Sequence, residues 1–166
     1  MKLSVTRLVV VGVVVALVAV GGFLASDLFL PEQSTTVNEA PVPADATAVK
    51  SGTFSGADAA HDVSGTVTLY QDGDGYFLRF ENYQQTQGPD VFVYLTPAEN
   101  PETSADVEAG TKVLVDGGAD GGESTKEGTF TQRLPADFDP ERYDGVSIWC
   151  DDFSVPFGSA SLSDAN

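Results

Sequence analysis

The most chemically distinctive residue of this chain is Cys150, its single cysteine, which directly follows its single tryptophan, Trp149. A thiol can act as a nucleophile, as a redox centre or as a ligand of a metal or haem iron. Asp151 and Asp152 come next and disfavour a further negative charge, so a free thiolate here would be a poor nucleophile. The local charges favour a ligand over a naked catalytic thiol, and a small buried core residue is the structural alternative.

His61 is the single histidine, and that count excludes whole classes of site. A blue-copper site needs two histidines beside a cysteine, and a structural zinc site needs four ligands, usually Cys or His. No nucleophile elbow accompanies His61, so a Ser-His-Asp hydrolase is only a weak third hypothesis. The histidine is therefore either a surface loop residue or a partner of Cys150 at a ligand site, and the residues leave the identity of any metal open.

Two further motifs are turns. Gly88-Pro89-Asp90 predicts a turn because proline fixes φ and aspartate caps its own backbone. It leads into the apolar run 91–95, which predicts a central strand. Residues 72–75 (DGDG) begin like a calcium loop but lack its distal glutamate, so a hairpin turn is the better interpretation.

Short strands are predicted to position these residues. Val146, Ile148 and Cys150 alternate with polar or bulky neighbours, which places Cys150 on the inward, apolar face. Similar runs recur between Gly, Pro and Asp from residue 51 to residue 162. About eight to ten such strands, with no long amphipathic helix, predict an all-β domain, an antiparallel β-sandwich or barrel-like fold.

The predicted core consists of the apolar side chains on the inward faces of these runs. They are Val67, Leu69, Leu78, Phe80, Val91, Val93, Leu95, Val113, Val115, Phe130, Val146, Ile148, Phe153 and Val155. Each large side chain contributes roughly 1.5–3 kcal/mol when fully buried, which offsets the ordering entropy of a domain this size. One cysteine cannot form an internal disulfide, so the core must hold the fold together.

Residues 1–30 predict a transmembrane helix that serves as an uncleaved signal anchor, because Lys2 and Arg7 precede a long aliphatic run. A cleaved signal peptide is the alternative. The positive-inside rule then predicts a single-pass protein of the cell membrane, with its C-terminal domain on the extracytoplasmic side.

Three segments are predicted after that helix. Residues 31–49 contain three prolines and no aromatic residue, which predicts a disordered linker. Residues 50–163 form the β domain, and residues 164–166 form a short tail. The linker would hold the domain away from the membrane.

The chain is strongly acidic: 8 Lys and Arg against 25 Asp and Glu give a net charge of −17 over 166 residues. Such a surface repels nucleic acid, which is therefore excluded as a partner, and suits a cationic or salt-screened protein partner. A halophilic source and an ordinary acidic exported protein both fit this composition.

Several motifs of the domain match one known family. They are Gly52-Thr-Phe54, His61 with Ser64-Gly-Thr66, Leu78-Arg-Phe80, Gly88-Pro-Asp90 with Val93-Tyr-Leu95, Leu134-Pro135, Tyr143, and Val146-Ser-Ile-Trp-Cys150 with Phe153, Val155, Phe157-Gly158, Ala160 and Leu162. On these residues the domain resembles the electron-transfer DM-thirteen domain family. It departs from the family pattern at residues 127–130 (EGTF), where a Gly-Asn-Gln-Tyr-like run is usual.

The resemblance implies a β-rich extracytoplasmic domain with a redox or electron-transfer role, anchored here to the membrane. Cys150 would be the redox thiol or the ligand of a prosthetic group such as haem, and His61 a second cofactor-binding residue. Trp149 and the Gly88-Pro89-Asp90 turn would support them. A protein redox partner is expected, for a module that is not a stand-alone enzyme. The alternative is a non-catalytic cell-surface binding or structural domain with a buried Cys150.

Overall fold

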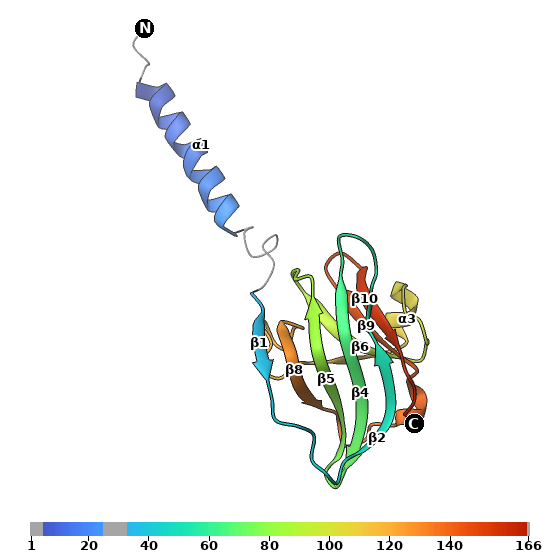
Figure 1. Ribbon diagram of the computed structural model, residues 1–166. Coiled ribbons are helices and arrows are strands. Elements are labelled where there is room, and N and C mark those ends of the chain that lie inside the picture. The colour runs from blue at the N-terminus through green and yellow to red at the C-terminus, as the bar shows by residue number, and fades with distance from the viewer. Residues whose placement is uncertain (1–4, 25–32, 166) are drawn as a thin grey trace. The chain divides into compact units, whose positions relative to one another are not determined.

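The computed structural model describes residues 5–24 and 33–165, which belong to two compact units, residues 1–31 and 32–166 (Figure 1). The first unit contains helix α1 (Val5–Leu24), formed by the aliphatic run. Within the described ranges, no helix is long and apolar enough to cross a membrane. The transmembrane helix predicted for residues 1–30 is therefore not confirmed, and residues 1–4 and 25–30 of that prediction lie outside the described residues.

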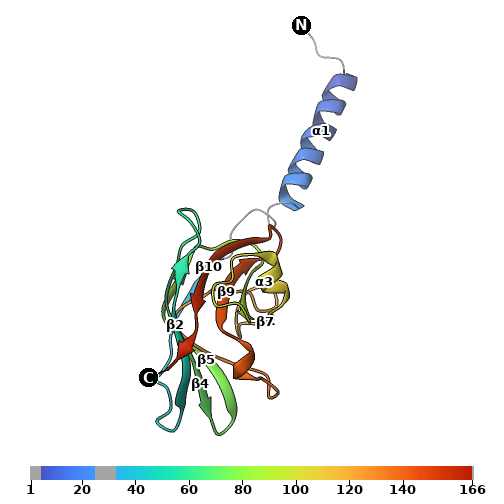
Figure 2. The same cartoon turned by 90° about the vertical axis from the view of Figure 1, so that its right-hand side faces the viewer.

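The second unit is a sandwich of two β-sheets, which confirms the predicted all-β class (Figures 1 and 2). Its described residues form eleven strands where about eight to ten antiparallel ones were predicted, and one pair is parallel. One sheet has the order β1-β8-β5-β4-β2-β11 and the other β3-β10-β9-β6-β7. The strands are β1 (Thr35–Asn38), β2 (Thr47–Thr53), β3 (Ser55–Gly56), β4 (Val63–Asp72), β5 (Gly75–Gln85), β6 (Val91–Thr96), β7 (Thr111–Val113), β8 (Lys126–Arg133), β9 (Gly145–Cys150), β10 (Val155–Ser161) and β11 (Ser163–Asp164). Neighbouring strands run antiparallel except β1 and β8, which are parallel.

Two short helical segments complete this unit, α3 (Ser104–Glu108) and the 3-10 helix η1 (Pro140–Arg142). Thr103 caps α3 in a capping box with Asp106, and Asp139 caps η1 ahead of a proline at its first position. Figure 2 shows α3 beside β9 and β7, on the outer side of the second sheet. All six residues of β9 are buried, so this strand of the second sheet is covered on both faces.

The core lies between the sheets, where Phe54, Phe80, Tyr83 and Phe130 pack ring against ring, with centroids 4.7 Å apart for Phe80 and Phe130. The predicted core residues are buried, with two exceptions. Val155 is only partly buried against the core, and Phe153 is 53% exposed. The prediction for Phe153 was wrong because residues 151–154 form a turn, so the alternation of β9 does not continue through it.

The linker prediction needs a correction, because residues 35–38 form β1 and residues 47–49 begin β2. β1 adds to the edge of β8, and Val37 packs against the core. The side chain of Glu39 accepts a hydrogen bond from the Thr131 amide at 2.8 Å. Backbone pairing with a distant strand orders a segment whose own sequence has too little apolar surface to fold.

The predicted tail is likewise part of the sheet. Ser163 and Asp164 form β11, which pairs with Ser51 and Lys50 of β2. The Ala165 amide donates to the Val49 carbonyl at 2.9 Å. The domain therefore extends beyond the predicted limits of 50 and 163 at both ends.

Candidate functional site

Cys150 is the last residue of β9, which is the middle strand of its sheet. It pairs with Val91 of β6 on one side and with Val155 of β10 on the other. Its exposed fraction is 0%, and it belongs to the main core cluster. The inward orientation expected from the alternation is thus observed.

Trp149 points to the opposite face of the same sheet, in register with Phe92 of β6. It is 4% exposed and lines a cavity of about 240 Å³ together with Tyr94 and Val107 of α3. Trp149 therefore lies near α3 on the outer face of the sheet, while Cys150 faces the interior.

The Gly88-Pro89-Asp90 turn lies directly against Cys150. The Cys150 thiol donates a hydrogen bond to the Pro89 carbonyl oxygen, with 3.2 Å between sulfur and oxygen. The Asp151 amide donates to the Asp90 carbonyl at 2.9 Å, so the next residue is also tied to this turn. Asp90 has φ of +49°, a left-handed conformation that aspartate tolerates better than most residues. Three residues predicted as support for the cysteine are thus brought to it by the fold.

Gly88 is required by close packing. A Cβ atom at this position would lie 2.7 Å from Cζ of Phe157 and 3.3 Å from a methyl of Val91. Since Phe157 is 5% exposed and part of the core, its ring has little room to move. Only glycine lets the turn approach the core closely enough for Pro89 to meet the thiol.

The electrostatic environment keeps Cys150 protonated. Burial raises the pKa of the thiol, and the negative charges of Asp152 and Asp90 raise it further. The backbone N–H groups of Phe153 and Asp152 act in the opposite direction, but burial outweighs them. The pKa of Asp90 is itself raised, first by desolvation and then by Asp152. The sulfur is therefore a neutral hydrogen-bond donor at neutral pH and not a ready nucleophile.

A network of polar side chains lies on the outer face and begins at Asp151, the residue after Cys150. The sequence did not predict it. Asp151 accepts a hydrogen bond from the Tyr94 hydroxyl at 2.8 Å and forms an ion pair with Lys112. Lys112 Nζ also lies 3.7 Å from the ring centroid of Phe92. Desolvation, followed by the Asp151 carboxylate, raises the pKa of Tyr94. The alternating polar position of Tyr94 in the predicted strand 91–95 is the one sequence signal for this arrangement.

A buried polar cluster on the other side of Val91 was also missed. The hydroxyl of Tyr83 donates to the amide oxygen of Gln85, which accepts a second hydrogen bond from the Ser124 hydroxyl at 2.8 Å. The Ser124 amide donates to the Val91 carbonyl at 2.7 Å. A register shift between Phe80 and Tyr83, with Asn82 at φ of +50°, changes the alternation and turns Tyr83 and Gln85 inward.

His61 is linked to this region through an aromatic ring. Its Nδ1 lies 3.0 Å from an Asp58 carboxylate oxygen, and its ring centroid is 4.5 Å from that of Phe157. Phe157 in turn touches the Gly88 position. No hydrogen bond joins His61 to Cys150, both of which lie in the described part of the chain. A role for His61 as a second ligand stays a prediction.

The described residues show no group of three or more His, Cys, Asp or Glu side chains placed to hold a metal ion. Haem ligation by Cys150 does not fit the arrangement as it stands. The sulfur is 0% exposed and is enclosed by Pro89 on one side and by the 151–154 turn on the other, so a macrocycle would have to displace one of them. The structure therefore shows a neutral thiol that is enclosed by the Pro89 carbonyl and the 151–154 turn.

Comparison with known proteins gives one match. Among curated proteins and among solved structures, none matches the chain. A model of the family described as "Electron transfer DM13" matches residues 53–162, from the end of β2 through β10. The match includes Cys150, the Gly88-Pro89-Asp90 turn and His61, and it covers well over half of the 166 residues. The chain therefore belongs to the electron transfer DM13 family.

Proposed function

We propose that this chain is an electron-transfer module on the extracytoplasmic side of a membrane, in which Cys150 is the redox-responsive residue. The observation that carries the proposal is the hydrogen bond from the Cys150 thiol to the Pro89 carbonyl oxygen. It fixes the single thiol of a chain that belongs to an electron-transfer family. The turn that contains Pro89 can approach the thiol because Gly88 has no side chain. A buried core cysteine can also donate a weak S–H hydrogen bond, so the proposal rests on this contact together with the family match.

Access to the sulfur is proposed to come from the 151–154 turn. This turn carries the exposed Phe153 and Ser154 at φ of +51°. After desolvation, the charge of Asp152 and a side-chain hydrogen bond with it raise the pKa of Asp90 beside the turn. Displacement of the turn would expose Sγ to a partner's disulfide. The thiol would lose its proton to solvent and the thiolate would attack one sulfur of that disulfide, so that a bond to Cys150 forms while the partner's S–S bond breaks and releases its second sulfur as a thiolate. In the closed state the raised pKa protects the thiol from oxidation by small molecules.

The membrane anchor is part of the proposal and rests on the sequence of residues 1–30. Lys2 and Arg7 before the aliphatic run favour an orientation with the β domain outside the cytoplasm. The net charge of −17 suits a cationic protein partner or a high-salt medium. Protease treatment of intact cells tests this orientation: the β domain should be digested from outside, and protection until the cells are lysed would contradict it.

A second function is favoured by the complete burial of Cys150. With an exposed fraction of 0%, the residue could simply complete the core of a cell-surface binding or structural domain. Replacement of Cys150 would then change the stability of the domain and nothing else.

Membrane vesicles from the native host separate the two functions. The vesicles carry the wild-type chain, Cys150→Ala or Ile148→Val, and the rate of electron transfer from the respiratory chain to ferricyanide is measured. Ile148 lies on the same strand and is equally buried, so its variant controls for a loss of core packing. The proposal predicts that only Cys150→Ala lowers the rate. Equal rates for all three, with equal amounts of folded protein, would favour the structural function.

A further inference from the structure

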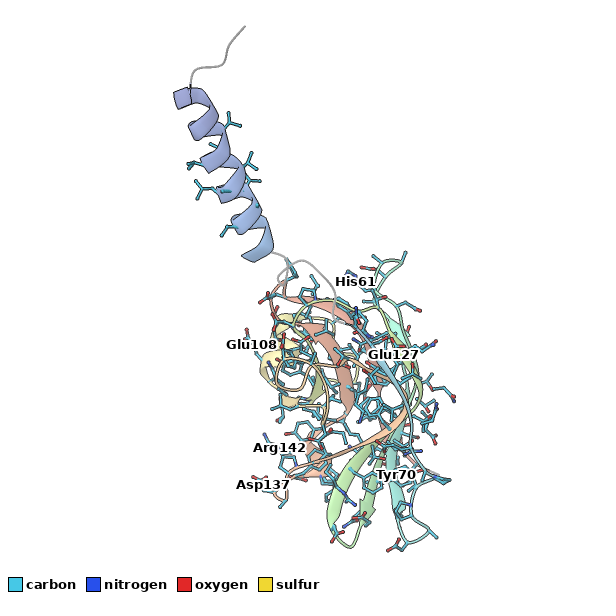
Figure 3. All side chains as sticks on the ribbon, turned by 90° about the vertical axis from the view of Figure 1, so that its left-hand side faces the viewer. His61, Tyr70, Glu108, Glu127, Asp137 and Arg142 are labelled. Atoms are coloured by element: carbon cyan, nitrogen blue, oxygen red, sulfur yellow. The ribbon has the colours of Figure 1, made fainter. Side chains whose placement is uncertain are left out.

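A second, larger cavity lies away from Cys150. It has a volume of about 590 Å³, within the range of roughly 300–1,000 Å³ that small-molecule sites occupy. It opens between β7, the end of β8 and the segment that carries η1, and Cys150 is not among its lining residues. Figure 3 shows Arg142 and Asp137, which line it, far from His61.

The inner wall of this cavity is apolar and aromatic. Leu95, Val113 and Leu134 are at most 9% exposed and form its base. Phe138 and Tyr143 stack with centroids 5.2 Å apart, and the Tyr143 hydroxyl is fixed by Thr111 Oγ1 at 2.7 Å. A rigid wall of this kind suits the flat apolar body of an organic molecule.

The rim carries a cation with no carboxylate partner. Two of the lining cations are neutralised from outside the cavity, Arg133 by Asp72 and Lys112 by Asp151. Arg142 makes no ion pair within the described residues, and its guanidinium lies 5.8 Å from the ring centroid of Tyr143. In a chain of net charge −17, an arginine left unpaired beside an aromatic wall is well suited to receive an anionic group.

Three carboxylates also line the cavity, Asp116, Asp137 and Asp139. Asp139 accepts the Glu141 amide as the cap of η1, and Asp116 accepts from the Gln132 side chain at 3.3 Å. These neutral donors leave the carboxylate charges in place, so an anionic group is attracted only where it contacts Arg142 directly.

From this wall and this unpaired cation we infer that the cavity binds an amphipathic aromatic monocarboxylate. The ring system would lie against Leu134 and Tyr143, and the carboxylate would pair with Arg142. This site is separate from Cys150 and does not depend on the proposed electron-transfer role.

The test uses the ¹⁵N-labelled full chain titrated with 2-naphthoate and with its neutral amide, 2-naphthamide, followed by amide chemical shifts. The naphthoate is expected to shift the resonances of Val113, Leu134 and Tyr143 and to bind more tightly than the amide. Arg142→Gln should weaken naphthoate binding about tenfold, the loss of one charge-assisted hydrogen bond, and leave amide binding unchanged. Arg142→Lys keeps the charge and should retain most of the affinity.

Lys126→Gln is the matched control, because it removes the same charge at a residue that does not line the cavity. It should leave the binding of both compounds unchanged. Three outcomes would overturn the inference: no shifts at the cavity up to the solubility limit, equal affinity for the acid and the amide, or an equal loss in Arg142→Gln and Lys126→Gln.

Discussion

The Cys150 thiol donates a hydrogen bond to the carbonyl oxygen of Pro89, across 61 residues of chain and with 3.2 Å between sulfur and oxygen. The contact joins the end of β9 to the turn before β6, and the Asp151 amide reinforces it by donating to Asp90. The turn and the cysteine therefore form one structural unit, and a substitution in either should shift the position of the other.

Gly88→Ala is expected to destabilise the domain by about 1–3 kcal/mol, the usual effect of overpacking a core. The new Cβ would lie 2.7 Å from Phe157, so the turn must move away from the core. Urea unfolding of the full chain gives the free energy of unfolding. Gly73→Ala is the control, since a Cβ there has no neighbour within 4 Å and should change stability by less than about 0.5 kcal/mol. Equal free energies for the two variants would show that Gly88 is not tightly packed.

The raised pKa of Cys150 predicts a pH dependence of stability. Below the pKa of the thiol in the unfolded chain, about 8.5, both states are neutral and the contribution of the thiol is fully present. As the pH rises from the unfolded pKa to the folded pKa, only the unfolded chain loses the thiol proton, so this stability is progressively lost. Unfolding free energies measured from pH 7 to pH 10.5 should fall more steeply for the wild type than for Cys150→Ala. Parallel curves would mean that the thiol pKa is not raised by the fold.

Asp151→Asn is expected to lower the pKa of Tyr94 while leaving it above its ordinary range. Desolvation is the larger cause of the shift and remains, whereas the hydrogen bond and charge of the carboxylate are removed. The ¹³Cζ resonance of Tyr94 followed against pH reports this titration. The same resonance of Tyr83, whose pKa is raised chiefly by burial, serves as the internal control and should not move. An unchanged Tyr94 titration would contradict the contact.

Gly128→Ala should detach β1 from β8. A Cβ at Gly128 would lie 2.3 Å from the Val37 carbonyl oxygen, and Gly128 has φ of +92°. Hydrogen exchange at the Thr35 and Glu39 amides, which donate to Thr125 and Thr129, should become faster. Gly75→Ala has similar backbone strain, with φ of +117°, but no close neighbour, so it should leave exchange in β1 unchanged. Faster exchange in both variants would assign the effect to strain alone.

Local patterns predicted the elements of this fold better than their contacts. The alternation at Val146, Ile148 and Cys150 placed the cysteine inward because a two-residue period holds throughout β9. The same rule made no prediction for Tyr83, because the irregularity after Phe80 reverses the alternation without an obvious mark in the sequence.

Contacts between segments that are distant in the sequence could not be predicted from local sequence patterns. β1 is four residues long and mostly exposed, and it exists because the edge of β8 supplies its hydrogen bonds. The turn at Gly88-Pro89-Asp90 was predictable from its residue types, but its hydrogen bond to Cys150 depends on how β6 and β9 pair. The family resemblance included this turn, and the fold shows that its Pro89 carbonyl contacts the Cys150 thiol.

The central claim is that Cys150 carries the redox response of the domain. Thiol–disulfide exchange with oxidised glutathione, followed by intact mass, tests this claim most directly, with wild type, Cys150→Ser and Ile148→Val compared in the folded state and in urea. The folded wild type and Ile148→Val should each form a mixed disulfide at Cys150 and release one reduced glutathione, and Cys150→Ser should form none. Modification of the wild type only after unfolding in urea would show that Cys150 is a closed core residue and would contradict the claim.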